Sequence, residues 1–147
     1  MSQSLVKVLI ITVVILMSMF LLKVAWDEYQ AHRASEQIPI VVGIIEQIQP
    51  FPGSARVESD SEGPSANAYA TVVWWSYRAN AKCSDVRAHL DAEASRIAFQ
   101  FHSIQNYSGN TQVFHRKGDY ETRWLFHPQN GSACDYAVSV NWGDYNT

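Results

Sequence analysis

Histidines are the residues of this sequence with the most versatile chemistry near neutral pH. No two of them have the i, i+4 spacing or the Cys/His spacing that marks a metal site. A predicted hairpin would pair His115 with Tyr120 on one face, but no carboxylate is evident there to orient the imidazole. The sequence therefore predicts no metal site and no cofactor from its five histidines, which are His32, His89, His102, His115 and His127.

The carboxylates do not suggest an acid–base pair either. Asp91 and Glu93 are two residues apart on a predicted helix, so they do not share a face. Glu58, Asp60 and Glu62 fall in a polar segment, where acidic residues are usually just solvated. The sequence also contains no nucleophile elbow and no glycine-rich phosphate loop. We therefore expect no catalytic residues and a protein that is not an enzyme.

The two cysteines are the strongest covalent signal in the sequence. Cys83 precedes a predicted helix, Cys134 begins a predicted strand, and the two are not in a Cys-x-x-Cys motif. A disulfide between them would join the helix to the sheet, which favours an oxidising compartment. The alternative is that both are buried, reduced thiols, which are common in protein cores.

Two consecutive tryptophans, Trp74 and Trp75, suggest a surface for a protein partner. Neighbouring side chains on a strand point to opposite faces of the sheet, so only one of the two can enter a core covered by the predicted helix. The other either lies under the segment of residues 38–48 or contributes to an exposed aromatic patch. We therefore treat both tryptophans as possible partner-binding residues.

An apolar run near the N-terminus is long enough to cross a membrane. Residues 8–22 carry no charge between Lys7 and Lys23, and the flanks extend the run from Leu5 to Trp26. These are about 22 residues, and a hydrocarbon core needs roughly 20. The lysines can extend to the interface, and Trp26 suits the headgroup level. We predict a single membrane-spanning helix that contacts the lipid bilayer from Leu5 to Trp26, within an anchor and stalk formed by residues 1–34.

Two alternatives compete with a membrane anchor. A cleaved secretory signal has a similar charged and apolar pattern, but cleavage after Ala25 would put Lys23 where a small residue is needed. A buried core helix would show a polar face, and this run has none. The basic residues on the two sides of the apolar run are nearly equal in number, so they do not predict its orientation. The expected disulfide does, because it favours a C-terminal domain outside the cytoplasm. We expect a single-pass protein of the bacterial inner membrane with its C-terminal domain in the periplasm or outside the cell.

The rest of the chain predicts one α+β domain, in which a small antiparallel sheet of about four or five strands carries one amphipathic helix. The helix is predicted over residues 85–101, after Ser84 as the N-cap, because Val86, Leu90 and Ala94 form an apolar stripe. Residues 50–67 are rich in Pro, Gly and Ser and predict a mobile loop. Residues 35–67 thus hold the first strand and this loop, and residues 68–147 form the domain core. Strands are predicted at residues 38–48, 69–78, 111–116, 120–127 and 134–142.

The alternation of apolar residues also predicts how the last two strands pair. A two-residue turn would mix the two faces of the sheet, whereas a three-residue loop, residues 130–132, keeps the apolar set together. The loop then pairs Phe126 with Tyr136, Trp124 with Val138 and Thr122 with Val140.

The charge balance narrows the expected function. From Ser35 onward, 8 Lys and Arg face 12 Asp and Glu, which disfavours binding to nucleic acid. Without a catalytic set, an extracytoplasmic binding or assembly domain that contacts an envelope protein is the favoured interpretation. An immunity or inhibitor protein that neutralises a toxin at the membrane is the first alternative, and it would favour an acidic contact surface. A membrane-tethered enzyme is the second.

Overall fold

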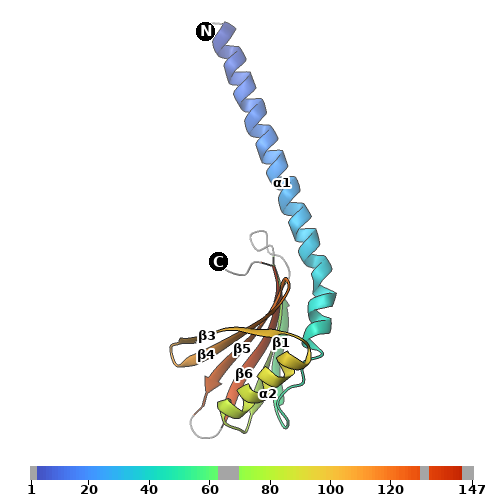
Figure 1. Cartoon of the computed structure of the whole chain (residues 1–147). Helices are drawn as coiled ribbons and strands as arrows, with labels where there is room; N and C mark the ends of the chain where they lie inside the picture. The colour runs from blue at the N-terminus through green and yellow to red at the C-terminus, as the bar shows by residue number, and fades with distance from the viewer. Residues whose placement is uncertain (1–2, 63–69, 130–132, 144–147) are drawn as a thin grey trace.

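The computed structural model describes residues 3–62, 70–129 and 133–143. It confirms the predicted α+β class, with a long N-terminal helix, a second helix and an antiparallel sheet of six strands (Figure 1). The elements in chain order are α1 (Gln3–Ile45), β1 (Ala55–Glu62), β2 (Thr71–Ala79), α2 (Cys83–Arg96), β3 (Gln100–Tyr107), β4 (Asn110–Lys117), β5 (Tyr120–Pro128) and β6 (Cys134–Trp142).

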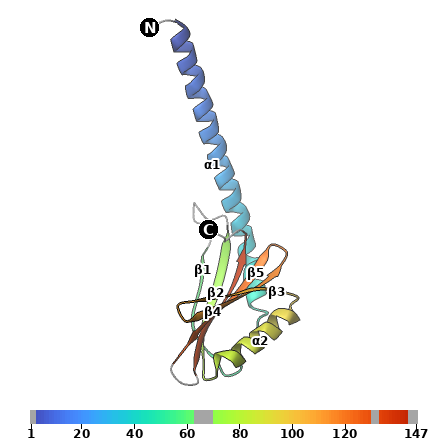
Figure 2. The same ribbon diagram turned by 60° about the vertical axis from the view of Figure 1, so that its left-hand side comes forward.

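Helix α1 continues from the apolar N-terminal run into the folded domain. All side chains from Val6 to Trp26 are exposed, and this half of the helix stands clear of the sheet in Figures 1 and 2. The helix is long and apolar enough to cross a membrane. Its other end packs on the sheet, where Ala34, Val41 and Ile45 are buried. One uninterrupted helix therefore joins the apolar run to the domain core.

The strand predicted at residues 38–48 is wrong, because α1 runs through Pro39 and ends at Ile45. A proline inside a helix costs about 3 kcal/mol, and β-branched residues favour strands. Here Val41, Ile45 and Ile48 recur at helical spacing and are all buried. Burying each such side chain contributes roughly 1.5–3 kcal/mol, so packing outweighs the local preference.

The sheet has the order β1-β2-β6-β5-β4-β3, and every neighbouring pair is antiparallel. Two of its strands were not predicted, and both are edge strands. β1 forms within the segment expected to be a mobile loop, and it pairs with β2 across a bulge between Arg56 and Glu58. Its polar sequence suits an edge, where one row of backbone groups faces solvent. The last part of that predicted loop, residues 63–67, lies outside the described residues.

Helix α2 is shorter than predicted, because it ends at Arg96 instead of continuing to Phe101. Ala98 has a φ of 64°, and the Phe99 N–H donates to the Ala94 carbonyl at 2.9 Å. A residue in this left-handed conformation ends a helix, and glycine is its usual signal. The chain has alanine at this position, so the turn into β3 could not be predicted from the residue type.

The predicted pairing of the last two strands is confirmed. Residues Phe126, Trp124 and Thr122 lie opposite Tyr136, Val138 and Val140. The loop expected to set this register, residues 130–132, lies outside the described residues. The pairing predicted for the preceding hairpin is wrong, because His115 lies opposite Thr122 and Tyr120 lies opposite Lys117.

Both helices pack on the same face of the sheet and share one core. α1 contacts β2 and β6, and α2 contacts β3, β5 and β6. The core contains Val41 and Ile45 from α1, Leu90 from α2, and Trp124 and Tyr136 from the sheet. The Glu93 carboxylate accepts hydrogen bonds from the Gln49 N–H and from Arg96, which fixes the chain after α1 against α2. The opposite face of the sheet lacks a covering helix among the described elements.

Candidate functional site

The candidate site is a groove of about 370 Å³ on the sheet face that neither helix covers. Ser76, Ala137 and Leu125 form one row across β2, β6 and β5, because Ser76 pairs with Ala137 and Ala137 with Leu125. The serine and alanine side chains are small, so they leave a hollow between larger neighbours. The groove is bounded by apolar Val57, Trp74 and Leu125 and by polar Arg78, His127 and Asp135.

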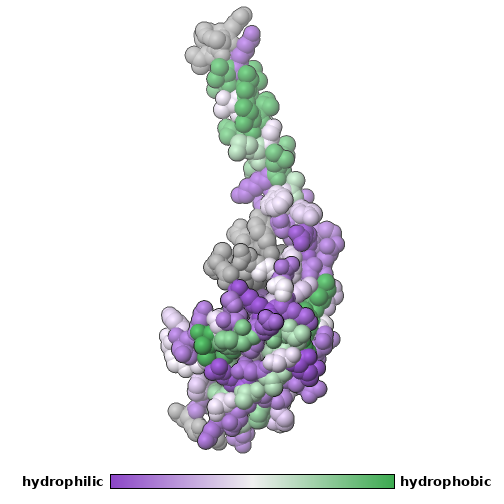
Figure 3. Space-filling view, viewed as in Figure 1, coloured by the Kyte–Doolittle hydropathy of each residue, from purple (hydrophilic) through white to green (hydrophobic). Residues whose placement is uncertain are grey.

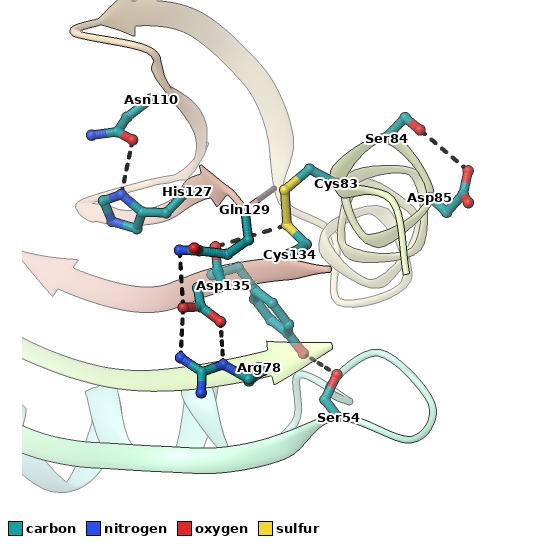
Figure 4. The surroundings of a disulfide bond; sticks show 11 residues. Ser54, Arg78, Cys83, Ser84, Asp85, Asn110, His127, Gln129, Cys134 and Asp135 are labelled. Carbon is teal, nitrogen blue, oxygen red and sulfur yellow. Dashed lines mark hydrogen bonds and ion pairs between the residues drawn. A yellow bond between two sulfur atoms is a disulfide. The ribbon is translucent and has the colours of Figure 1, made fainter. Parts of the chain in front are cut away.

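A charged pair closes one end of the groove. The Arg78 guanidinium donates two hydrogen bonds to the Asp135 carboxylate, at 2.7 and 2.9 Å (Figure 4). Gln129 also donates to Asp135 at 3.2 Å. The hydrogen bond from Arg78 holds the pKa of Asp135 below its usual range. The pair is exposed to solvent, so its contribution to stability is small and it is available to order polar groups of a ligand.

The structure separates the two tryptophans singled out from the sequence. Trp74 lies opposite Ser139 and lines the groove, and its side chain is half-buried. Trp75 lies opposite Val138 and packs against the core on the helix-covered face, with the Arg56 guanidinium 4.0 Å from the centre of its ring. The segment of residues 38–45 covers the face of Trp75, so it does not cover Trp74. Of the two, only Trp74 can contact a ligand in the groove.

The predicted disulfide between Cys83 and Cys134 is present (Figure 4). Their Cα atoms are 5.1 Å apart, and the bond joins the first residue of α2 to the first residue of β6. Asp135 follows Cys134 directly and bounds the groove. The disulfide therefore fixes the end of β6 from which the groove begins.

A second polar cluster lies under α2, on the covered face. The His115 side chain is only 3% exposed, and its Nε2 atom lies 3.4 Å from the Asp91 Oδ1 atom. The rings of Phe101 and Trp124 flank the imidazole at centroid distances of 5.9 and 5.5 Å. Sequence reasoning missed this carboxylate, because the helix that carries Asp91 is brought over β4 only by the tertiary fold.

The expected meeting of His115 and Tyr120 does not occur. The Tyr120 hydroxyl donates to the Gln37 side-chain oxygen at 2.8 Å and so points toward α1. His115 points toward Asp91 on α2. The two side chains share a face of the sheet but interact with different helices. They do not form the acid–base pair that an enzyme would need at that position.

Burial of His115 gives stability a defined pH dependence. Desolvation lowers the pKa of His115 below its ordinary value, while nearby Asp91 partly opposes this. Above about pH 6.5 the imidazole is neutral in both folded and unfolded chains. Below that pH the unfolded chain binds the proton first, so stability falls as pH falls. We expect a loss of at most about 1.4 kcal/mol per pH unit below pH 6.5, down to the depressed pKa.

Urea denaturation of the detergent-solubilised protein between pH 7.5 and 5 measures this slope. His115→Gln should flatten it, although the variant is less stable at every pH. His102→Gln is the matched control, because His102 is exposed on β3. An unchanged slope in His115→Gln would show that other groups take up the proton.

Among the described residues, no group of three or more His, Cys, Asp or Glu side chains could hold a metal ion. Comparison with protein families, with curated proteins and with solved structures finds no match for this chain.

Proposed function

We propose that this chain is a single-pass membrane protein whose C-terminal domain lies outside the cytoplasm and binds a protein partner of the cell envelope. The partner places an apolar side chain in the groove beside Trp74, and the domain binds it without catalysing a reaction. The observation that carries this proposal is an apolar groove on an uncovered sheet face of a domain joined rigidly to an apolar helix.

The N-terminal helix supports anchoring. Figure 3 shows an apolar band along the outer part of α1, followed by hydrophilic residues nearer the domain. The helix continues from Trp26 to Ala34, the first residue of α1 in the core. At 1.5 Å per residue, this segment holds the domain about 12 Å from the end of the span. Lys23 remains an obstacle to cleavage after Ala25, which favours an anchor over a removed signal.

The disulfide supports an extracytoplasmic location. Disulfides persist in oxidising compartments and are rare in the reducing cytoplasm. The bond between Cys83 and Cys134 links two elements that the fold already brings together. A bacterial inner membrane with the domain in the periplasm is the setting that combines this bond with a single N-terminal span.

The chemistry of the groove favours a protein ligand. Trp74, Leu125 and Val57 offer apolar surface, and tryptophan is enriched among residues that dominate protein interfaces. The hydrogen-bonding groups of Arg78 and Asp135 lie at one end, where they can interact with a peptide backbone. Because these two charges neutralise each other, the groove does not present the acidic surface that the inhibitor alternative would favour.

Photo-crosslinking in intact cells tests the proposal. A photoreactive amino acid at Ser76, inside the groove, should give one discrete adduct with an envelope protein. The same probe at Asp119, an exposed residue of the turn after β4, is the matched control and should not give that adduct. Trp74→Ala in the Ser76 probe strain should reduce the adduct roughly tenfold, as expected for an interface side chain worth at least about 1.4 kcal/mol.

The proposal would be overturned if crosslinking were not specific to the groove. Equal adducts from Ser76 and Asp119, or an adduct insensitive to Trp74→Ala, would show that the groove is not the binding surface. The location is checked in the same cells with Asp119→Cys. A membrane-impermeant maleimide should label it without lysis, and labelling only after lysis would place the domain in the cytoplasm.

A further inference from the structure

The free edge of β3 is unusually apolar for an exposed strand. β4 is its only sheet neighbour among the described strands, so the outer row of backbone N–H and C=O groups is unpaired. Phe101, Ile104 and Tyr107 on this strand are 59%, 41% and 75% exposed. Such an edge is a template for pairing with another strand, and most proteins protect it with charges or proline.

The other edge of the same sheet is protected in that way. β1 carries Arg56, Glu58, Asp60 and Glu62 within its eight residues. By contrast, residues 97–115, which include β3 and most of β4, contain no Asp, Glu, Lys or Arg. The β1 edge therefore carries charged residues that oppose pairing with another strand, and the β3 edge is neutral over its full length. The difference identifies β3 as the edge at which an added strand meets no electrostatic barrier.

The geometry suits a second copy of this chain. Identical strands that pair antiparallel are related by a two-fold axis, so each residue meets the same sequence in reverse. A strand rich in one sign of charge would oppose like charges in this arrangement, and neutral β3 does not. Figures 1 and 2 show β3 running across the direction of α1 in both views. Two copies anchored in one membrane can therefore present their β3 strands antiparallel about an axis along the membrane normal.

The bulge in β3 limits which residues can lie opposite each other. Phe101 pairs with His115 and Ser103 with Phe114, so His102 is the extra residue and the alternation of faces restarts after it. Pairing centred on Ile104 keeps residues of the same face opposite each other. It places Ile104 beside its own copy, Ser103 opposite Gln105 and Phe101 opposite Asn106. Registers centred on Ser103 or Gln105 also keep the faces together, and only the register centred on Ile104 places this residue on the two-fold axis beside its own copy.

We propose that β3 is a self-association site, at which two membrane-anchored copies of this chain join their sheets through antiparallel β3 strands centred on Ile104. An eight-residue strand alone makes a small interface. The membrane compensates, because anchoring confines both copies to one surface and raises their effective concentration. The groove beside Trp74 is remote from β3 in the strand order, so the dimer carries two open grooves.

Cysteine crosslinking in membranes tests the register. The full-length Ile104→Cys protein should form a homodimer on mild oxidation, because directly opposed residues have Cβ atoms about 4.5–5.5 Å apart. Ser59→Cys on the β1 edge is the control, since Ser59 is also exposed on an edge strand and does not line the groove, and it should remain monomeric. Intact mass distinguishes a homodimer from an adduct with another protein, which would overturn self-association.

A charge at the same position tests the interface without a crosslinker. Ile104→Lys places two lysines against each other on the two-fold axis, so the dimer fraction in native membranes should fall roughly tenfold. Ser59→Lys on the β1 edge should leave it unchanged. Circular dichroism and thermal unfolding establish that both exposed-site variants fold. Dimerisation that survives Ile104→Lys in a folded protein, or that Ser59→Lys disrupts equally, would show that β3 is not the contact.

Discussion

Replacing Cys83 and Cys134 together by alanine is expected to lower the free energy of unfolding by about 4 kcal/mol. The disulfide closes a loop spanning 51 positions, and constraining a loop of that length removes about this much entropy from the unfolded chain. Typical domains are stable by only 5–15 kcal/mol, so a large part of the total depends on one bond. The Cys134 side chain is fully buried, and alanine leaves little polar surface unsatisfied there.

Urea denaturation of the full-length protein in detergent measures this loss. The single variant Cys83→Ala should lose nearly as much stability as the double variant, because either one opens the loop. Ser84→Ala is a control beside the bond, since its hydroxyl contacts only the exposed Asp85 carboxylate, and it should change stability by less than about 0.5 kcal/mol. A loss below about 1 kcal/mol in the double variant would mean that the native contacts alone hold α2 on the sheet.

Elements with clean periodicity were predictable from the sequence. β6 alternates Tyr136, Val138 and Val140 with smaller or polar residues, and only one register keeps this apolar face together with that of β5. The cysteine pair was predictable for a related reason, because each cysteine stands at the end of an element with a clear pattern. The alternation of apolar and polar residues was therefore sufficient to predict the pairing of β5 and β6.

Edge strands and helix ends were not predictable in the same way. β1 is polar because one of its edges faces solvent, so its composition is that of a loop. β3 begins where an alanine takes a left-handed conformation that the sequence does not announce. Residues 38–45 have strand-forming types but a helical spacing, and only their burial against the sheet decides between the two. In each case tertiary contacts set the outcome.

The candidate site was only partly predictable. The sequence identified Trp74 as unusual because two adjacent tryptophans cannot both enter one core. It did not identify the groove, because Ser76, Ala137 and Leu125 come from three strands whose order in the sheet is not sequential. A small side chain does not by itself predict a groove. The hollow forms only because the pairing of the strands brings these residues into one row. The contact between His115 and Asp91 is hidden for the same reason.

A substitution near the C-terminal end of α1 is expected to cause a second large loss of stability. It tests whether this part of the helix belongs to the folded domain. Ile45 is fully buried in the hydrophobic core, whereas Ile40 on the same helix is 46% exposed. Ile45→Asp removes a buried side chain, worth roughly 2–5 kcal/mol for loss to alanine, and also buries an unpaired carboxylate. We expect a loss of at least about 4 kcal/mol, sufficient to unfold much of the protein.

Ile40→Asp is the matched control, with the same substitution five residues earlier, and it should change stability by no more than about 0.5 kcal/mol. Tryptophan fluorescence in urea follows both variants, because buried Trp124 reports the core. Similar stabilities for the two variants would mean that α1 is only a tether and that the domain folds without it. A large difference would show that α1 is itself a core element, so the orientation of the groove relative to this helix is fixed by packing and not by a flexible linker.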